Sequence, residues 1–185
     1  LPTPTHPHAV PTSAPIRAGK HVYTEKPLTR TVLQSRTLRQ LAAKHKVATS
    51  MGNQGTASPA FRRAVELIRD GVIGQIKQVH TWNDQGGADF SQPPEGEQPV
   101  PPHLDWDLWL GPARQRPFHS GWLKWHAWRD FGTGNLGNWA SHTQNLAFMA
   151  LKVDALWHAQ PSDKPILRVE AKSKGVNRLS FPRWE

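Results

Sequence analysis

The chain has no cysteine among its 185 residues, so disulfides and thiolate chemistry are excluded. Long apolar runs are missing as well. No stretch approaches the about 20 apolar residues that span a bilayer, and we expect a soluble protein with no membrane partner. These absences do not select a compartment, because a cysteine-free chain suits the cytoplasm and the periplasm equally.

Acidic residues are scarce in the first third of the chain. Residues 1–65 contain ten Lys and Arg against Glu25 alone, so this third carries the whole net charge of +9. A nucleic-acid surface would interleave its cations with stacking rings, and this third has only Tyr23 and Phe61 besides its histidines. We therefore expect no nucleic-acid partner. A solvated helix face and a surface for an anionic cofactor both remain open.

Apolar periodicity predicts helices and strands that alternate along the first half of the chain. We expect helices over 9–18, from an N-cap at Thr29 to about His45, and from Ser58-Pro59 to Gly71, with strands at Val22-Tyr23, Val47–Met51 and Ile76–Trp82. This order is typical of the α/β class. Further on we expect a functional or mobile loop over 83–103, an amphipathic turn or helix over Asp105–Leu110, a helix over Leu136–Leu151 and a strand over Leu167–Ala171.

A glycine-rich segment, Gly132 to Gly137, matches the dinucleotide fingerprint GxGxxG. That fingerprint needs an apolar parallel strand directly before it, and residues 125–131 do not form one. We favour a glycine loop that lets a helix N-terminus approach a substrate. The helix carries Asn138 and His142 on one face, and histidine is the residue type suited to exchange a proton with a sugar hydroxyl near neutral pH.

Histidine and tryptophan offer two further hypotheses. His6 and His8 are two residues apart, but they need a third ligand that no motif supplies, so we expect no metal site. Six of the nine tryptophans lie between Trp106 and Trp139. Their rings serve either as core or as flat faces for a sugar, and the sequence leaves both open.

The most informative stretch is Gly19-Lys-His-Val-Tyr-Thr-Glu-Lys-Pro-Leu28. Its Glu-Lys-Pro corner follows a short strand, and Pro27 restricts the backbone of Lys26, so one ammonium leaves the strand end in a defined direction. Together with Met51–Thr56, Gly71–Gly74, Leu104–Pro112 and Asp130–Leu151, this stretch resembles the Gfo/Idh/MocA family of nicotinamide-dependent sugar and polyol oxidoreductases.

The resemblance implies a fold and a set of site residues. Residues 1–55 would be the last part of a Rossmann domain, and residues 56–185 the first part of an α/β substrate domain with an open mixed sheet. Lys26 and His142 would be catalytic, with Asn138 beside the histidine. The expected cofactor-binding residues are Glu25, Pro27, His6, His8, Asn53 and Gln54, and the expected substrate-binding residues are Trp125, Trp128, Arg129, Asn138 and His142.

The chain also departs from the family pattern. The glycine fingerprint and first strands of the Rossmann domain have no counterpart, so we expect a piece truncated at both ends that binds NAD or NADP weakly or not at all. Asn138 and Asn145 stand where the family commonly has aspartates. Because an amide cannot ionise, Asn138 cannot raise the basicity of His142 as a carboxylate would.

Four functions follow as hypotheses. The first is a truncated nicotinamide-dependent oxidoreductase that acts on a sugar or polyol. The alternatives are an NAD-dependent glycosidase of the same family, a non-enzymatic oligomeric remnant or binding module, and a histidine-based metal-dependent hydrolase. Missing strands would expose sheet edges, and we expect a homo-oligomer that pairs through them.

Overall fold

The computed structural model describes residues 4–83, 92–158, 160, 162, 168–173 and 177–181, and it is mixed α/β with a small parallel sheet. The chain groups into two compact units. The first contains residues 1–52, 85–138 and 173–185, and the second contains residues 53–84 and 139–172.

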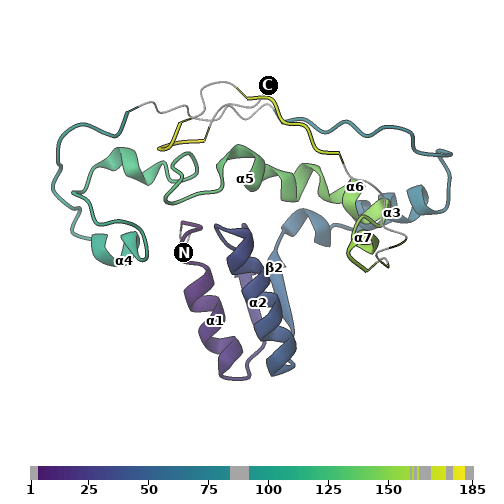
Figure 1. Cartoon of the computed structure of the whole chain (residues 1–185), viewed down its shortest axis with the longest axis horizontal. Coiled ribbons are helices and arrows are strands. Elements are labelled where there is room, and N and C mark those ends of the chain that lie inside the picture. The colour runs from purple at the N-terminus through teal and green to yellow at the C-terminus, as the bar shows by residue number, and fades with distance from the viewer. Residues whose placement is uncertain are drawn as a thin grey trace. The chain divides into compact units, whose positions relative to one another are not determined.

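The first unit begins with the parallel arrangement that the sequence predicts. Helix α1 (Ala9–Arg17) is followed by strand β1 (Val22–Glu25), helix α2 (Val32–His45) and strand β2 (Thr49–Gly52). The strands run parallel, with Val22 opposite Thr49 and Glu25 opposite Gly52. Figure 1 shows α1 and α2 lying side by side next to the sheet. Both strands therefore end at the same edge, which is where open α/β sheets bind ligands.

Helix α2 begins two residues later than the sequence predicts. Thr31 is the N-cap, and it forms a capping box with Gln34. The expected cap, Thr29, is buried instead; its Oγ1 donates to the Thr31 carbonyl at 2.8 Å and lies 2.6 Å from the Ser35 hydroxyl. Leu33 is 75% exposed, and the buried residues of α2 are Leu38 and Ala42.

An aromatic core forms the other part of the first unit. Helix α4 (Trp106–Leu110) and the 3₁₀ turn η2 (Ser120–Leu123) contribute to it. Its buried members are Trp106, Leu110, Phe118, Trp122, Trp128 and Phe131. The Arg116 guanidinium lies over the Trp122 and Phe131 rings, 4.6 and 5.0 Å from their centroids, and forms an ion pair with Asp130.

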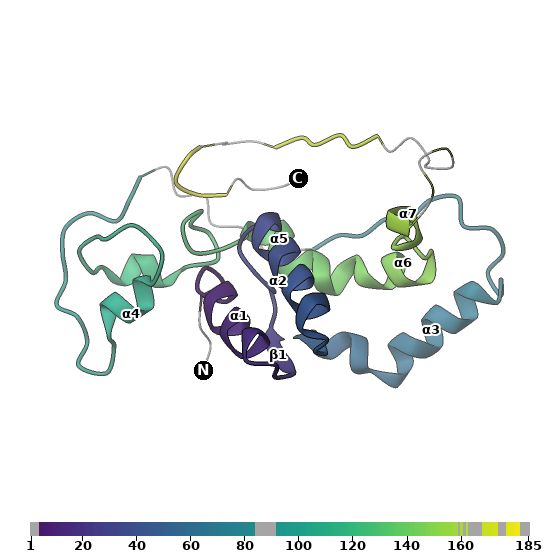
Figure 2. The same cartoon turned by 60° about the horizontal axis from the view of Figure 1, so that its bottom comes forward.

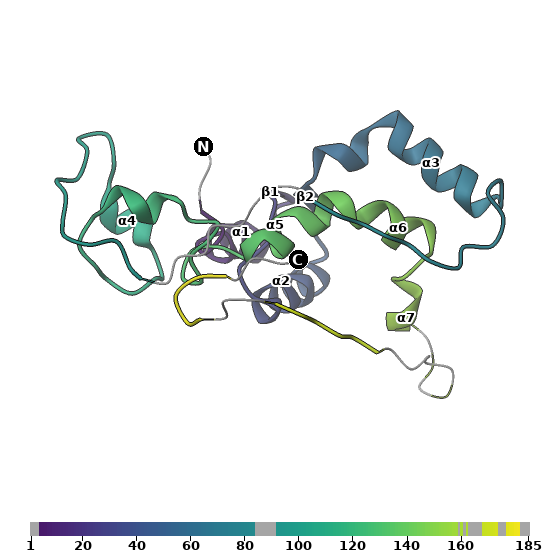
Figure 3. The same ribbon diagram turned by 90° about the horizontal axis from the view of Figure 1, so that it is seen from above.

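The second unit is helical in its described part. It contains the 3₁₀ turn η1 (Gln54–Ala57), α3 (Pro59–Arg69), α6 (Asn145–Ala150) and α7 (Ala155–His158), and helix α5 (Gly134–Thr143) enters it from the first unit. Figure 3 shows α3 and α6, which contact each other. The helix that we predicted over 136–151 is therefore two helices, with Gln144 as the N-cap of α6.

Two predicted strands are wrong for the described residues. Ile76–Trp82 is extended chain with no strand pairing there, and so are residues 168–171; Leu167 lies outside the described residues. A strand needs neighbouring strands to be stable, and propensity alone does not provide them. In the predicted loop over 83–103, residues 84–91 also lie outside the described part. No described helix has the length and apolarity to cross a bilayer.

Candidate functional site

The Lys26 corner is built by strand β1 and by the start of α1. Lys26 follows the last residue of β1 and is joined to Pro27 by a cis peptide bond. The buried His8 donates from Nδ1 to the Pro27 carbonyl at 2.8 Å. Because His8 precedes α1, this bond ties the corner to the helix that lies against β1; Figure 2 shows both elements together.

Lys26 reaches a residue that is 112 positions away in the sequence. Its Nζ donates a hydrogen bond to Oδ1 of the buried Asn138 at 2.5 Å. Partial burial lowers the pKa of Lys26, while the nearby Glu25 carboxylate opposes that shift. Lys26 and Asn138, both predicted as catalytic residues, are thus in direct contact. The Lys26 ammonium is a hydrogen-bond donor that is partly shielded from water.

The Glu25 side chain packs against the end of β2. Glu25 and Gly52 are opposite each other in the sheet register. A Cβ on Gly52 would lie 2.6 Å from a Glu25 carboxylate oxygen, so the carboxylate lies directly against the backbone of Gly52. The Glu25 carboxylate is therefore held beside Lys26 by the end of the neighbouring strand.

His6 lies in the aromatic core of the first unit. Its ring is 5.0 Å from the Phe131 ring, and its Nε2 lies 3.1 and 2.9 Å from the carbonyls of Trp109 and Leu110. Nε2 therefore carries the hydrogen, and Nδ1 is buried without a partner. Burial lowers the pKa of His6, so this ring is neutral at pH 7. Among the described residues, no three His, Asp or Glu side chains group as metal ligands.

Helix α5 carries the other predicted catalytic residues. Asn138 and His142 lie one turn apart, and the half-buried His142 ring is 5.6 Å from the Trp139 ring. In the second unit, Asn53 Nδ2 donates to the Ser141 carbonyl and Asn145 Nδ2 donates to the Thr56 hydroxyl at 2.7 Å. These two side-chain hydrogen bonds connect α5 and α6 to residues 53–56. Gln54 is exposed in η1, and a cofactor role for it and for Asn53 stays a prediction.

The glycine-rich segment does not fit a pyrophosphate. A Cβ on Gly132 would lie 2.6 Å from the Trp125 carbonyl oxygen and 2.7 Å from that of His126, so the backbone of the chain itself fills this side of the loop. Gly134 has a φ of +68°, and turns rather than a strand precede the helix. The glycines serve close backbone packing and a left-handed conformation. This agrees with the sequence argument against a dinucleotide fingerprint.

The two tryptophans predicted to bind substrate differ in burial. Trp128 is 2% exposed, and its Nε1 donates to the Gly121 carbonyl at 2.9 Å, so it is a core residue and offers no open face to a sugar. Trp125 is only partly buried. Arg129 donates from Nε to the Asn177 carbonyl at 2.8 Å and lies 4.7 Å from the Phe181 ring centroid, which ties residues 177–181 to the first unit.

His126 is a residue of this region that the sequence did not single out. Its pKa is lowered, first by partial burial and then by the positive charge of Lys26. The family signature points to Lys26 and to α5 but gives no signal at His126. Its closeness to Lys26 depends on how residues 125–134 turn before α5, which only the tertiary structure reveals.

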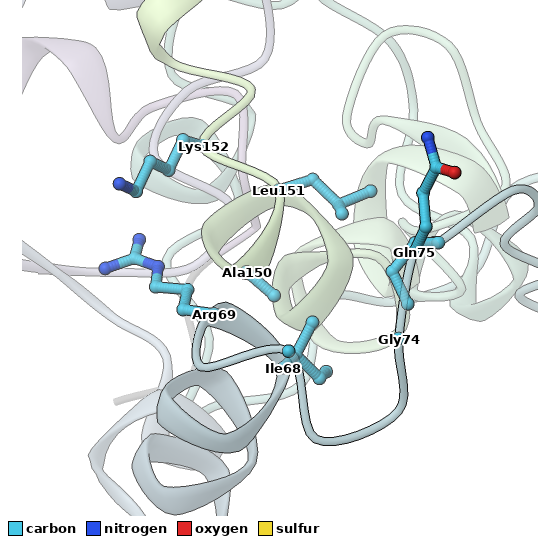
Figure 4. A pocket seen from close by; sticks show the side chains of 9 residues that line it. Ile68, Arg69, Gly74, Gln75, Ala150, Leu151 and Lys152 are labelled. Atoms are coloured by element: carbon cyan, nitrogen blue, oxygen red, sulfur yellow. The ribbon is translucent and has the colours of Figure 1, made fainter.

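A separate cavity of about 480 Å³ lies in the second unit. Figure 4 shows Arg69 and Lys152 pointing to one side of it. Both residues stand at or just after the C-terminal ends of helices, where cations complement the helix dipole, and Arg69 donates to the Met149 carbonyl at 2.6 Å. None of the predicted site residues lines this cavity.

Comparisons with known proteins agree with the sequence signature. Residues 1–53 match the Gfo/Idh/MocA family model, described as an oxidoreductase family with an NAD-binding Rossmann fold. The chain is 31% identical over 128 residues to the uncharacterized oxidoreductase sll0816 of Synechocystis, a match over 69% of this chain and 27% of that protein.

Two further relatives match shorter segments. Levoglucosan dehydrogenase of Pseudarthrobacter phenanthrenivorans is 32% identical over 92 residues, which are 49% of this chain and 24% of that protein. The uncharacterized oxidoreductase YdgJ of Escherichia coli is 29% identical over 99 residues, 47% of this chain and 29% of that protein. The matched residues span about a quarter of the length of these relatives.

Proposed function

This chain belongs to the Gfo/Idh/MocA oxidoreductase family, and we propose that it carries the substrate-side groups of an oxidoreductase that acts on a sugar or polyol. The proposal rests on the hydrogen bond from Lys26 to Asn138. This bond connects the Glu-Lys-Pro motif with the motif on α5, at the carboxyl edge of the parallel strands. The relative named levoglucosan dehydrogenase supports a carbohydrate as the substrate class.

Lys26 has the role of a positioned donor. Its ammonium binds and polarises the oxygen of the reacting carbon, and its lowered pKa makes the ammonium a better proton donor than an exposed lysine. Glu25, held over Gly52, keeps negative charge beside it. His142, one turn after Asn138 on α5, is the proposed proton-exchange group.

The cofactor of the family is NAD, which supplies the redox chemistry. The glycine-rich segment of this chain does not fit its pyrophosphate, because the Trp125 and His126 carbonyls occupy the space beside Gly132. We therefore propose that the isolated chain binds the cofactor weakly.

The test compares Lys26→Met with Lys20→Met. Turnover of levoglucosan, glucose and myo-inositol is followed with added NAD or NADP, and binding of the same probes is followed by saturation-transfer NMR. We expect Lys26→Met to lower turnover about 10²-fold or more, and to weaken binding, because it removes a positioned group. Lys20 lies before β1 and leaves both unchanged. Equal effects at the two lysines would mean that Lys26 is an ordinary surface charge.

A second candidate is a binding module without turnover. Asn138 favours it, because an amide in contact with Lys26 accepts a hydrogen bond but takes up no proton. Probe binding that depends on Lys26, without any turnover, would select this candidate. The NAD-dependent glycosidase stays an alternative; of the clustered tryptophans that would offer faces to its sugar, Trp106, Trp122 and Trp128 are buried in the core.

A further inference from the structure

Residues 125–134 bring His126 to the first turn of α5. The Gly134 N–H donates to the His126 carbonyl at 3.2 Å, and Gly132 packs so closely against the same carbonyl that a Cβ there would lie 2.7 Å from it. His126 is thereby fixed at the start of the helix whose next turn carries Asn138, the partner of Lys26. Contacts of the His126 carbonyl with Gly132 and Gly134 therefore determine where the backbone of His126 lies relative to α5.

The imidazole of His126 is held from one side and open on another. Its ring stacks on the Trp125 ring, with centroids 3.5 Å apart and planes 29° apart, and the residue is exposed to solvent. Stacking engages one face of the ring and uses neither ring nitrogen as a hydrogen-bonding group. Charge from Lys26 and partial burial both disfavour the imidazolium, so the ring is neutral at pH 7 and offers one acceptor nitrogen.

Lys26 and His126 both lie near the first turns of α5, the former through Asn138 and the latter through its carbonyl. Lys26 supplies only donors, and its neighbour Asn138 already accepts from it. Lys26 is the charged group that acts on the His126 ring, and Glu25 acts in turn on Lys26; on the segment of His126 itself, Asp130 is paired with Arg116. An ammonium beside a neutral imidazole suits a hydroxyl compound, whose oxygens accept and whose hydroxyl hydrogens donate.

We propose that His126 is a ligand-contacting residue of the Lys26 site and that its imidazole accepts a hydrogen bond from a hydroxyl of the bound sugar or polyol. The inference rests on the proposed function and extends it to a residue outside the family signature. Because only the neutral ring accepts, ligand affinity falls as the pH drops through the pKa of His126, which lies below its ordinary value of 6.5.

The first test is an NMR titration of the histidine rings in the full chain. Lys26→Met removes the positive charge that lowers the pKa of His126, so that pKa rises, whereas Lys20→Met leaves it unchanged. An unchanged His126 pKa in Lys26→Met would overturn the placement of the two groups beside each other. This arm needs no ligand, so it stays informative whatever the substrate is.

The second test measures binding of levoglucosan, glucose and myo-inositol to the wild type, His126→Phe and His126→Gln. Phenylalanine keeps the stack on Trp125 but has no acceptor, so we expect about tenfold weaker binding, the value of roughly one hydrogen bond. Glutamine restores an acceptor and recovers part of the affinity. Circular dichroism checks that both variants fold.

The outcomes separate the two proposals. Weaker binding in Lys26→Met with unchanged binding in His126→Phe would overturn the role of His126 and leave the proposed function standing. Equal losses in His126→Phe and His126→Gln would also overturn it, because they indicate a role in packing. A wild type that binds none of the probes would contradict both proposals.

Discussion

His6 and His8 are two residues apart, yet they have different roles in the fold. His8 holds the Pro27 carbonyl and so the corner that presents Lys26, whereas His6 lies among aromatic rings with one nitrogen unpartnered. The family signature predicted both as cofactor-binding residues. The partners of His6 lie more than 100 positions away in the sequence, whereas His8 bonds to Pro27 within the same motif region, so the sequence could not separate these roles.

A pH dependence of stability follows from His6. Its pKa lies below 6.5 in the folded chain and near 6.5 in the unfolded chain, so the unfolded state binds more protons between the two values. Stability is therefore full above about pH 6.5 and is lost as the pH falls below it. Urea unfolding at pH 7.5 and pH 5 should show a smaller loss of unfolding free energy in His6→Asn than in the wild type.

The matched control is His103→Asn, because His103 is exposed. It should keep the wild-type loss. Identical losses in the wild type and His6→Asn would contradict a buried, neutral His6.

At the scale of elements, the sequence predicted most of what local patterns determine. The parallel strands, the helix between them and the start of α3 at Pro59 are confirmed, because apolar periodicity and capping residues encode them. The break between α5 and α6 and the unpaired chain over Ile76–Trp82 were not predicted, since they depend on which partners the element finds.

The turn before α5 gives a prediction at this scale. Gly132→Ala places a Cβ 2.6 Å from a backbone carbonyl oxygen, where neither atom can move without shifting residues 125–126. We expect destabilisation by about 1–3 kcal/mol, the usual cost of overpacking, measured by urea unfolding. Gly55→Ala is the control, because no atom lies within 4 Å of its added Cβ. Equal unfolding free energies for the two variants would refute the close packing of this turn.

At the scale of the whole molecule, the family resemblance predicted more of the site than the amino-acid composition did. It predicted that Lys26 and Asn138 belong to one site, and the structure brings them into contact. The resemblance did not predict His126, because the position of this residue depends on a packed loop without regular secondary structure. The two-stranded sheet leaves an edge on each strand in the described residues, and pairing of such edges in a homo-oligomer stays a prediction.

The most direct measurement of the central claim is a cross-linking experiment, which the absence of native cysteine makes unambiguous. Lys26→Cys/Asn138→Cys is treated with a short bismaleimide, and the intramolecular product is identified by mass spectrometry. The control is Lys20→Cys/Asn138→Cys, because residue 20 precedes β1 and lies about 20 Å along the chain from residue 26. We expect efficient cross-linking of the first pair in the folded chain and its loss in urea. Equal yields for both pairs, or no product from the first, would contradict a site built by Lys26 and Asn138.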